Sequence, residues 1–269
     1  MIQGALLFNK NKEIGKPMWN LKGQCAVITG GTKGIGKSTV LEFLDLGAKV
    51  LFTARNREDV EEMEKELREK NFNVTGIVSD VSDKEDRQKL YKWVQKEWGK
   101  LDILVNNAGI NIRKKALEYT EEEFKKIMEI NLSAPFEISR NLYPYLKLSK
   151  AGTVINVASA AAMQDVGTGT PYAMAKAGLL QQTRSLAVEW AKDGIRVNAV
   201  SPWFTETPLT QGLLSQKERM DPILSRTPLK RVARAEEMAS IIAFLAMEKS
   251  SYITGQNIIA DGGMSINAI

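Results

Sequence analysis

A tyrosine and a lysine four residues apart, with a serine upstream, are the residues most able to do chemistry in this chain. They are Tyr172, Lys176 and Ser159. On a helix, residues i and i+4 share a face, so the phenol and the ammonium would lie together. The pKa of tyrosine is ordinarily about 10, and a nearby ammonium would lower it. This pattern indicates acid–base catalysis by a phenol, although Tyr-x-x-x-Lys alone also occurs by chance on surface helices.

Histidine is absent from the 269 residues, and cysteine occurs once. Acid–base catalysis therefore has to use groups other than imidazole. Cys25 begins an apolar run, which favours a buried structural thiol over a nucleophile. With so few nitrogen and sulfur ligands and no evident carboxylate cluster, we expect no metal site.

The charge pattern excludes several classes of partner. The net charge is +5, but basic and acidic residues alternate, and no run of five like charges occurs. We therefore expect no nucleic-acid partner, whereas a modest positive potential suits a small molecule rich in phosphate. No apolar run is long enough to cross a membrane. We expect a cytoplasmic protein, with residues 1–19 as a leader of uncertain order that is not a signal peptide.

Short apolar runs alternate with helical patterns from residue 24 onward. Such alternation predicts a parallel sheet covered by helices on both faces. We predict one α/β domain over residues 20–269, a doubly wound, Rossmann-type sheet of seven parallel strands, with residues 207–230 as a lid. The expected strands are 24–29, 49–54, 74–79, 102–106, 153–159, 196–201 and 257–260. The expected helices are 34–46, 57–70, 83–98, 120–148 with a kink at Pro135, 171–192 and 235–247.

A glycine-rich stretch directly follows the first expected strand and precedes a helix. Glycines in this context permit a tight turn, close approach to a pyrophosphate and close helix–strand packing. The helix N-terminus then offers free N–H groups to the phosphates. A plain flexible turn is the alternative interpretation. The predicted phosphate-binding residues are Gly30, Thr32, Lys33, Gly34, Ile35 and Gly36.

The end of the second strand indicates which dinucleotide binds. An NAD site places an acidic residue there to bind the ribose hydroxyls. Here Arg55 and Asn56 follow the strand, and there is no carboxylate. Arg55 can form a fork with a 2′-phosphate, and Lys33 can add a second cation. We therefore predict NADP in preference to NAD.

Two further strand ends carry polar or small residues. Asp80 and Val81 end the third strand, where a polar side chain could bind the adenine amino group. Asn107, Ala108 and Gly109 end the fourth, where small residues would let the chain pass close to a cofactor. Ordinary turns are the alternative at both places.

Taken together, these motifs strongly resemble the short-chain dehydrogenase/reductase family. The resemblance covers residues 20 to 263. It rests on Thr-Gly-x-x-x-Gly-x-Gly at 29–36, Asn-Asn-Ala-Gly at 106–109, Asn131, Ser159, Tyr172 with Lys176, Pro202, and Asp-Gly-Gly at 261–263. Within the family the chain is most similar to tropinone-reductase-like members, through the stretches 19–23, 185–193 and 251–256.

The resemblance implies four catalytic roles. Tyr172 would be the general acid in reduction and the base in oxidation. Lys176 would lower the Tyr172 pKa and bind the nicotinamide ribose, and Ser159 would polarise the substrate carbonyl. Asn131 would hold the Lys176 end of a proton-relay water chain. Without the resemblance, a polar residue inside a helix would explain Asn131 equally well, and a turn residue would explain Ser159.

The segment after the sixth strand departs from the family pattern. The family usually has Pro-Gly there, whereas this chain has Pro202-Trp203. Trp203 either packs away from the site or narrows the substrate pocket. Pro202, Phe204 and Thr207 are predicted cofactor contacts, and Thr207 matches the threonine expected at the nicotinamide carboxamide or phosphate.

The predicted substrate pocket is mainly apolar. Its residues are Ser159, Ala161, Met163, Val166, Tyr172, Trp203, Leu209 and Leu213. Arg113 could reach the rim, although a solvated loop charge is the favoured interpretation. The expected substrate is a small or medium, mainly apolar ketone or secondary alcohol.

Three functions remain open. The leading hypothesis is an NADP-dependent carbonyl reductase, a tropinone-reductase-like oxidoreductase. A 3-oxoacyl-thioester reductase of the same fold is the second, and a non-catalytic dinucleotide-binding protein the third. The complete set of four catalytic residues argues against the third. The family resemblance also implies a homo-oligomer, a homotetramer built through the long helices.

Overall fold

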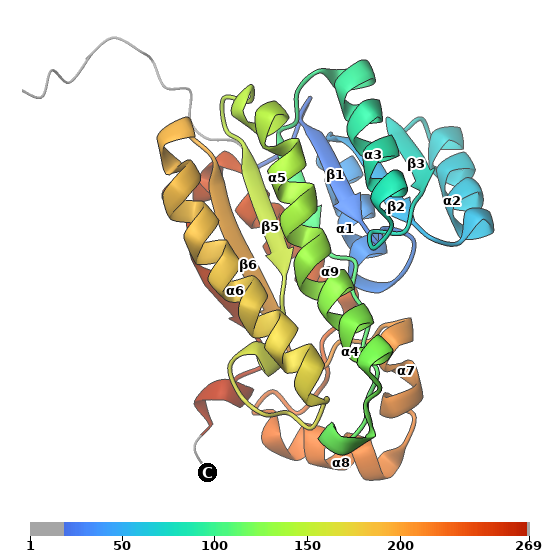
Figure 1. The fold of residues 1–269 in the computed structure, drawn as a ribbon, viewed down its shortest axis with the longest axis vertical. Coiled ribbons are helices and arrows are strands. Elements are labelled where there is room, and N and C mark those ends of the chain that lie inside the picture. Colours follow the sequence, from blue (N-terminus) through green and yellow to red (C-terminus); the bar gives the residue numbers. More distant parts are fainter. Residues whose placement is uncertain (1–18, 268–269) are drawn as a thin grey trace, which may run out of the picture.

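Seven parallel strands form one sheet at the centre of the molecule (Figure 1). The computed structural model describes residues 19–267. The strands lie in the order β3-β2-β1-β4-β5-β6-β7, which confirms the predicted fold class. The strands are β1 (Cys25–Thr29), β2 (Lys49–Ala54), β3 (Val74–Val78), β4 (Ile103–Asn106), β5 (Thr153–Val157), β6 (Arg196–Pro202) and β7 (Asn257–Ala260).

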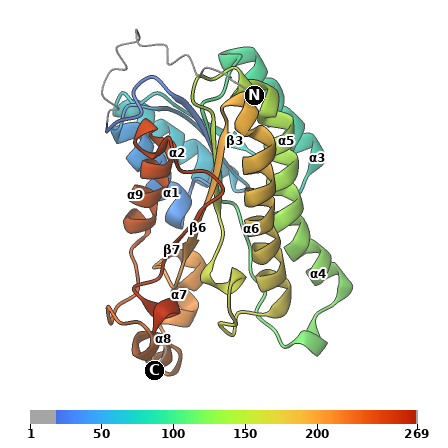
Figure 2. The same cartoon turned by 90° about the vertical axis from the view of Figure 1, so that its left-hand side faces the viewer.

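Helices cover both faces of this sheet. The α-helices of the described residues are α1 (Gly34–Asp45), α2 (Arg57–Glu69), α3 (Lys84–Trp93), α4 (Glu121–Met128), α5 (Ala134–Lys147), α6 (Thr170–Trp190), α7 (Pro208–Leu214), α8 (Lys217–Arg226) and α9 (Ala235–Ala246). Figure 2 shows α1, α2 and α9 on one face, and α3, α5 and α6 on the other.

Two separate apolar clusters explain this layering. Phe43 of α1 and Ile242 of α9 belong to the cluster on one face. Leu142 of α5 and Trp190 of α6 belong to the cluster on the other. The five inner strands between them are mostly apolar because both of their faces are buried. Each fully buried large aliphatic side chain contributes about 1.5–3 kcal/mol to folding.

The strand order reverses between β1 and β4, which both lie at the centre of the sheet. In open α/β sheets this reversal opens a crevice at the carboxyl ends of the strands. Asn107 bridges the two strand ends, because its side-chain amide donates to the carbonyls of Thr29 at 2.9 Å and Gly30 at 3.0 Å.

Two predicted helices contain π-helical turns that the sequence pattern did not reveal. The first is Val94–Trp98 at the end of α3, and the second is Glu129–Ser133, between α4 and α5. We predicted a kink at Pro135, but the irregular turn precedes it. Pro135 lies in the first turn of α5, where a missing N–H is tolerated.

The remaining predictions for the chain differ in outcome. Residues 207–230 are helical in pieces, forming α7 and α8. Most of the predicted leader, residues 1–18, lies outside the described residues. Within the described range, every helix is too short or too polar to span a bilayer.

Two turns at the amino ends of strands are open. Gly99, which lies ahead of β4, and Gly194, ahead of β6, have positive φ angles of 64° and 73°. A Cβ placed on either glycine would meet nothing within 4 Å. Glycine is therefore required there for its backbone conformation and not for close packing.

Candidate active site

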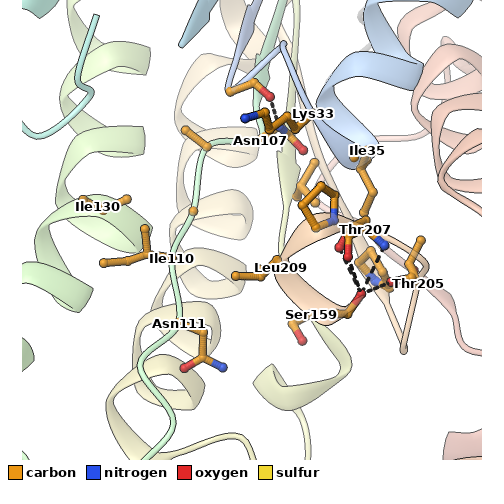
Figure 3. A pocket seen from close by; sticks show the side chains of 18 of the residues that line it. Lys33, Ile35, Asn107, Ile110, Asn111, Ile130, Ser159, Thr205, Thr207 and Leu209 are labelled. Carbon is orange, nitrogen blue, oxygen red and sulfur yellow. Dashed lines mark hydrogen bonds between the residues drawn. The ribbon is translucent and has the colours of Figure 1, made fainter. Parts of the chain in front are cut away.

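A cavity of about 520 Å³ lies along the carboxyl ends of the strands. Residues that follow each strand from β1 to β6 line it, so the sheet brings together segments far apart in the sequence (Figure 3). The lining includes three of the four predicted catalytic residues, Tyr172, Lys176 and Ser159. It also includes nearly all predicted cofactor residues, namely Gly30, Thr32, Lys33, Gly34, Ile35, Arg55, Asn56, Asp80, Val81, Asn107, Ala108, Gly109, Pro202, Phe204 and Thr207.

The glycine-rich loop is packed too closely for side chains at its critical positions. A Cβ on Gly36 would lie 2.0 Å from the Gly30 carbonyl oxygen. Gly36 therefore does not line the cavity but allows the first turn of α1 to pack on the loop. Lys33 precedes α1 and makes no side-chain capping hydrogen bond, and no acidic residue lies in the first helical turn. The first N–H groups of α1 therefore remain available to an anion.

The opposite wall of the cavity is also closely packed. A Cβ on Gly109 would lie 2.9 Å from Asn131 Oδ1 and 3.6 Å from Lys176 Nζ. Asn131 is fully buried in the π-helical turn. Its amide donates to the carbonyls of Ile110 and Ile127, both at 2.9 Å, and its oxygen accepts from the Ile110 N–H at 3.3 Å. Asn131 thus holds the segment after β4 in place and does not line the cavity.

Tyr172 and Lys176 lie one turn apart at the start of α6. Lys176 Nζ is 5.7 Å from the centre of the Tyr172 ring and donates to the Val157 carbonyl at 2.8 Å. Ser159 lies just beyond β5, and its hydroxyl accepts from the Ala161 N–H at 3.1 Å. The ammonium, the phenol and the hydroxyl therefore all lie at one end of the cavity.

Burial governs the protonation of both titratable groups. Burial raises the Tyr172 pKa above its usual value, while the hydrogen bond with Ser159 and the positive charge of Arg113 oppose this rise. Burial also lowers the Lys176 pKa to about 8. The raised Tyr172 pKa is opposite to the direction that the sequence predicts, because desolvation of the phenolate outweighs the nearby charges.

Charged side chains line the other end of the cavity. Lys33 forms an ion pair with Asp59 at 2.6 Å, and Arg55 lies 4.0 Å from Asp80. Both cations are more than half exposed. These ion pairs therefore stabilise the fold by at most about 1 kcal/mol each, and an incoming phosphate can compete for the cations.

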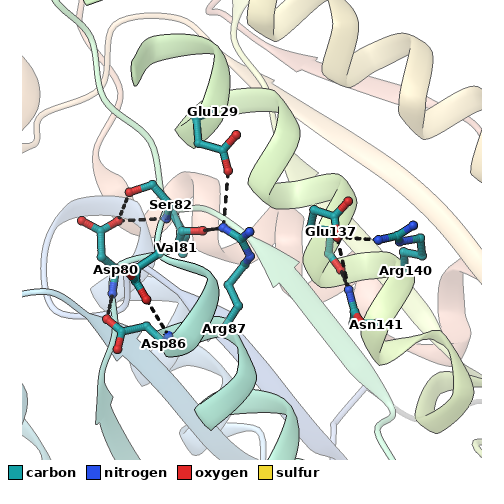
Figure 4. A network of polar contacts seen from close by, with 10 residues as sticks. Asp80, Val81, Ser82, Asp86, Arg87, Glu129, Glu137, Arg140 and Asn141 are labelled. Atoms are coloured by element: carbon teal, nitrogen blue, oxygen red, sulfur yellow. Dashed lines mark hydrogen bonds and ion pairs between the residues drawn. The ribbon is translucent and has the colours of Figure 1, made fainter. Parts of the chain in front are cut away.

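A polar network holds the loop after β3 in position (Figure 4). The Asp80 carboxylate accepts from the N–H and the hydroxyl of Ser82, at 2.9 and 2.6 Å. Arg87 of α3 donates to the Val81 carbonyl at 2.6 Å and lies 3.4 Å from Glu129. The loop that lines the cavity is thereby joined to α3 and to the π-helical turn.

Trp203 both lines the cavity and packs against the segment beyond it. Its indole N–H donates to the Thr227 hydroxyl at 3.0 Å, and its ring meets that of Phe204 edge-on, 4.6 Å between centres. Thr207 closes the cavity near the glycine loop, because its Cβ would be 3.0 Å from a Cβ on Gly34. Trp203 therefore both packs against the segment beyond the site and narrows the cavity, the two alternatives that the sequence left open.

Three predicted substrate residues do not line the cavity. Ala161 is buried in the short turn that follows Ser159. Met163 is 41% exposed, and its sulfur accepts from the Asn257 amide. Leu213 lies on the second turn of α7, whereas Leu209 on the first turn does line the cavity. Val166 also lines it, as predicted.

Several lining residues were not singled out by the sequence pattern. They include Asp59, Ser79, Ile110, Asn111, Ile130, Thr168, Thr205 and Thr210. Asn111 and Thr168 lie 57 residues apart in the sequence and are hydrogen-bonded to each other. The only available signal was their nearness to the Asn-Asn-Ala-Gly motif and to Tyr172. Arg113, which we interpreted as a solvated loop charge, also lines the cavity.

These residues fit a nicotinamide dinucleotide. The cradle formed by Gly30 and Gly36 admits no Cβ, and no side chain caps the first N–H groups of α1. Lys33 and Arg55 follow β1 and β2 on one side of the cavity, whereas the proton-transfer groups lie beside the end of β5, further along the sheet. An elongated ligand with phosphates near its middle matches this distribution of charge.

Known proteins share both the sequence pattern and the fold. The model of a family described as Enoyl-(Acyl carrier protein) reductase matches residues 30–265. A tropinone reductase homolog of Arabidopsis thaliana is 43% identical over 250 residues, 93% of this chain and 95% of the relative.

Two solved structures have the same architecture. A gluconate 5-dehydrogenase from Burkholderia cenocepacia, in complex with NADP and tartrate, has a TM-score of 0.88 and 28% identity, covering 93% of this chain and 98% of its own. A putative short-chain alcohol dehydrogenase from Sinorhizobium meliloti has a TM-score of 0.88 and 31% identity, covering 93% and 100%. With the fold, the motifs and the family model in agreement over most of its length, the chain belongs to the short-chain dehydrogenase/reductase family.

Proposed function

We propose that this protein is an NADP(H)-dependent reductase of a small or medium carbonyl compound with a mainly apolar body. As a member of the short-chain dehydrogenase/reductase family, the protein is an oxidoreductase that acts on alcohol or ketone groups. The observation that carries the proposal is the convergence of Tyr172, Lys176 and Ser159 in the cavity that the glycine-rich loop also lines.

The proposed chemistry assigns one task to each side chain. A reduced nicotinamide, when bound, supplies a hydride to the carbonyl carbon. Ser159 and Tyr172 donate hydrogen bonds to the carbonyl oxygen, and fixed donors stabilise the charge that develops there. Tyr172 then gives its proton to that oxygen, and its raised pKa keeps the phenol protonated until it is needed. Lys176 supplies positive charge beside the phenol, and Asn131 acts as a positioning residue.

The preference for NADP rests on the charges near β2. Arg55 and Lys33 line the cavity. Arg55 directly follows β2, at the place where an NAD site has a carboxylate. A guanidinium forms a fork with a phosphate. The Burkholderia cenocepacia relative with this fold was solved with NADP. The 2′-phosphate would displace Asp80 and Asp59 from these two cations.

A 3-oxoacyl-thioester reductase is the second candidate. The description of the matching family model names an acyl-carrier-protein reductase. Arg113, Lys114 and Lys115 lie in one surface segment, but Glu123 already neutralises Lys114 at 2.6 Å. The basic patch that would bind an acidic carrier is therefore small, and we favour a free carbonyl compound.

Three broader features complete the proposal. Residues 207–230 form a lid over the cavity of a single domain. This assignment is supported by the start of α7 beside the glycine-rich loop and by the hydrogen bond from Trp203 to Thr227. A shallow groove between α5 and α6 exposes Phe136, as expected of a surface that pairs with a second copy in a homotetramer. A cytoplasmic location and the absence of nucleic-acid partners stay predictions from the sequence.

The direct test is NADPH consumption with a panel of aliphatic and cyclic ketones. We expect turnover with some members and at least about tenfold lower kcat/KM with NADH. 3-Oxoacyl thioesters in the same panel test the second candidate. Binding of NADPH without reduction of any of these compounds would contradict the proposal of an apolar ketone substrate.

A further inference from the structure

Arg113 is an unbalanced charge in the lining of the cavity. At the other end, the cations Lys33 and Arg55 each face a carboxylate. Lys176 is buried against a backbone carbonyl. Arg113, by contrast, has no ion-pair partner anywhere in residues 19–267.

The position of Arg113 is at the reacting end. Its charge acts on Tyr172 strongly enough to oppose the rise of that pKa. Its near neighbour Asn111 lies beside Thr168, two residues before the start of α6. Figure 3 shows Asn111 near the level of Ser159 and well away from Lys33.

The segment that carries Arg113 is braced on both sides. Asn111 donates to the Thr168 hydroxyl at 2.5 Å. The Tyr119 hydroxyl donates to the Ile112 carbonyl and accepts from the Lys114 N–H at 3.2 Å. A Cβ on Gly169 would lie only 2.1 Å from the same hydroxyl, so the segment packs closely against the start of α6. The backbone on either side of Arg113 is therefore fixed although its side chain is exposed.

A second polar group at this end also lacks a partner. Asn111 Oδ1 is buried and accepts no hydrogen bond within the described range. Buried polar atoms in proteins are nearly always satisfied by the protein, by water or by a ligand. The reacting end of the cavity is therefore polar as well as apolar, although the sequence predicts an apolar pocket. Arg113 supplies a cation on a braced backbone, and Asn111 Oδ1 can accept a hydrogen bond from water or from a ligand donor.

We infer that the substrate is a carbonyl compound that carries a carboxylate, and that Arg113 binds this carboxylate while Tyr172 and Ser159 hold the carbonyl oxygen. The inference rests on the proposed function and adds the charge of the substrate to it. A guanidinium accommodates a carboxylate through two parallel hydrogen bonds. The apolar lining residues Val166, Trp203 and Leu209 contact the body of the molecule. The same positive charge disfavours substrates that are cationic amines.

The test compares cyclic keto acids with their methyl esters, for example 4-oxocyclohexanecarboxylate and its ester. The two members of a pair share the carbonyl and differ in charge. We expect the protein to prefer the acid. Arg113→Gln should raise KM for the acid at least about tenfold and should remove the preference for the acid over the ester. Arg113→Lys should restore part of the preference.

Lys115→Gln is the matched control, since it removes a positive charge from the same segment at a residue that does not line the cavity. Equal use of acids and esters by the wild type, or equal losses for both in Arg113→Gln, would overturn the inference. If neither member of any pair is reduced, the proposed function fails instead. Calorimetric titration of the keto acid in the presence of NADP⁺ then tests Arg113 as the carboxylate-binding residue. The inference requires that the wild type binds the keto acid and that Arg113→Gln does not.

Discussion

At the scale of single residues, burial favours the neutral form of both proton-transfer groups. The Tyr172 pKa is raised, and the Lys176 pKa falls to about 8. The phenol is therefore a ready acid at neutral pH, whereas the ammonium next to it is lost a little above neutrality. As the pH rises, Lys176 therefore loses its proton before Tyr172 does.

This order of titration predicts the pH dependence of reduction. Below about pH 8 Lys176 is charged and Tyr172 is protonated, so kcat/KM for the carbonyl substrate should be constant. Above about pH 8 Lys176 loses its proton, so kcat/KM should fall. Lys176→Arg keeps its charge and should move this decline to higher pH in a steady-state pH profile. A decline at the same pH in both proteins would contradict the assignment.

Removal of the phenol hydroxyl should abolish the chemical step but not cofactor binding. Tyr172→Phe is expected to lower kcat about 10²–10⁴-fold, the usual contribution of a positioned general acid. The Kd for NADPH, measured by fluorescence titration, should stay within about twofold. Tyr252→Phe is the control, because Tyr252 is fully exposed. Comparable rates in wild type and Tyr172→Phe would exclude the proposed mechanism.

The choice of cofactor should depend on Arg55 and not on the neighbouring Arg57. Arg57 is paired with Glu61 at 3.0 Å and does not line the cavity. Arg55→Ala should raise KM for NADPH about 10–100-fold, the range of a charge-assisted hydrogen bond, with little effect on NADH. Arg57→Ala should leave both unchanged. Steady-state kinetics with NADPH and NADH measure both effects. Equal KM values for NADPH in Arg55→Ala and Arg57→Ala would refute the role of Arg55.

At the scale of elements, the site depends on how closely α1 approaches the end of β1. Only a glycine at position 36 allows this approach, since a Cβ there would lie 2.0 Å from the Gly30 oxygen. The free N–H groups of α1 are useful only if the helix stays in this position. Phosphate binding therefore depends on the same close packing that sets the geometry of the loop.

Gly36→Ala should damage both properties together. Overpacking of this kind costs about 1–3 kcal/mol of stability, and the loop must shift, so NADPH affinity should fall at least about tenfold. Gly212→Ala in α7 is the matched control, because its Cβ would meet nothing within 4 Å. That change should be neutral or slightly stabilising. Thermal unfolding with and without NADPH measures both effects.

Local patterns explain why the elements were predictable and part of the pocket was not. The strands, the loop at Gly30 and the turn containing Tyr172 and Lys176 are encoded by nearby residues. The π-helical turn at Asn131 is not, because it depends on hydrogen bonds to Ile110 on another segment. The place of Arg113 likewise depends in part on the hydrogen bond between its neighbour Asn111 and Thr168, 57 residues further along the chain.

The errors at the substrate pocket have the same origin. Met163 follows Ser159 closely and is apolar, yet the short turn after Ser159 directs its sulfur to Asn257. Leu213 is one helical turn from Leu209 and still lies outside the cavity. Sequence proximity to a catalytic residue therefore predicts the region of the pocket but not which side chains line it.

At the scale of the whole molecule, the exposed apolar residues on α5 and α6 predict self-association. Phe136 is 40% exposed and Val188 is 82% exposed. Phe136→Glu should shift the protein to a smaller species in light scattering after gel filtration. Leu117→Glu should leave the mass unchanged, because the exposed Leu117 lies in the short 3-10 turn Ala116–Glu118 and not on α5 or α6. A monomeric wild type would show that these helices do not form an interface.

The parallel sheet also has a practical consequence for handling the protein. All proposed chemistry lies at the carboxyl ends of the strands, whereas Gly99 and Gly194 lie in open turns at the opposite edge. A cysteine inserted beside either glycine could carry a fluorophore or attach the molecule to a solid support. Such an attachment would leave the reacting edge facing the solution, where ligands arrive.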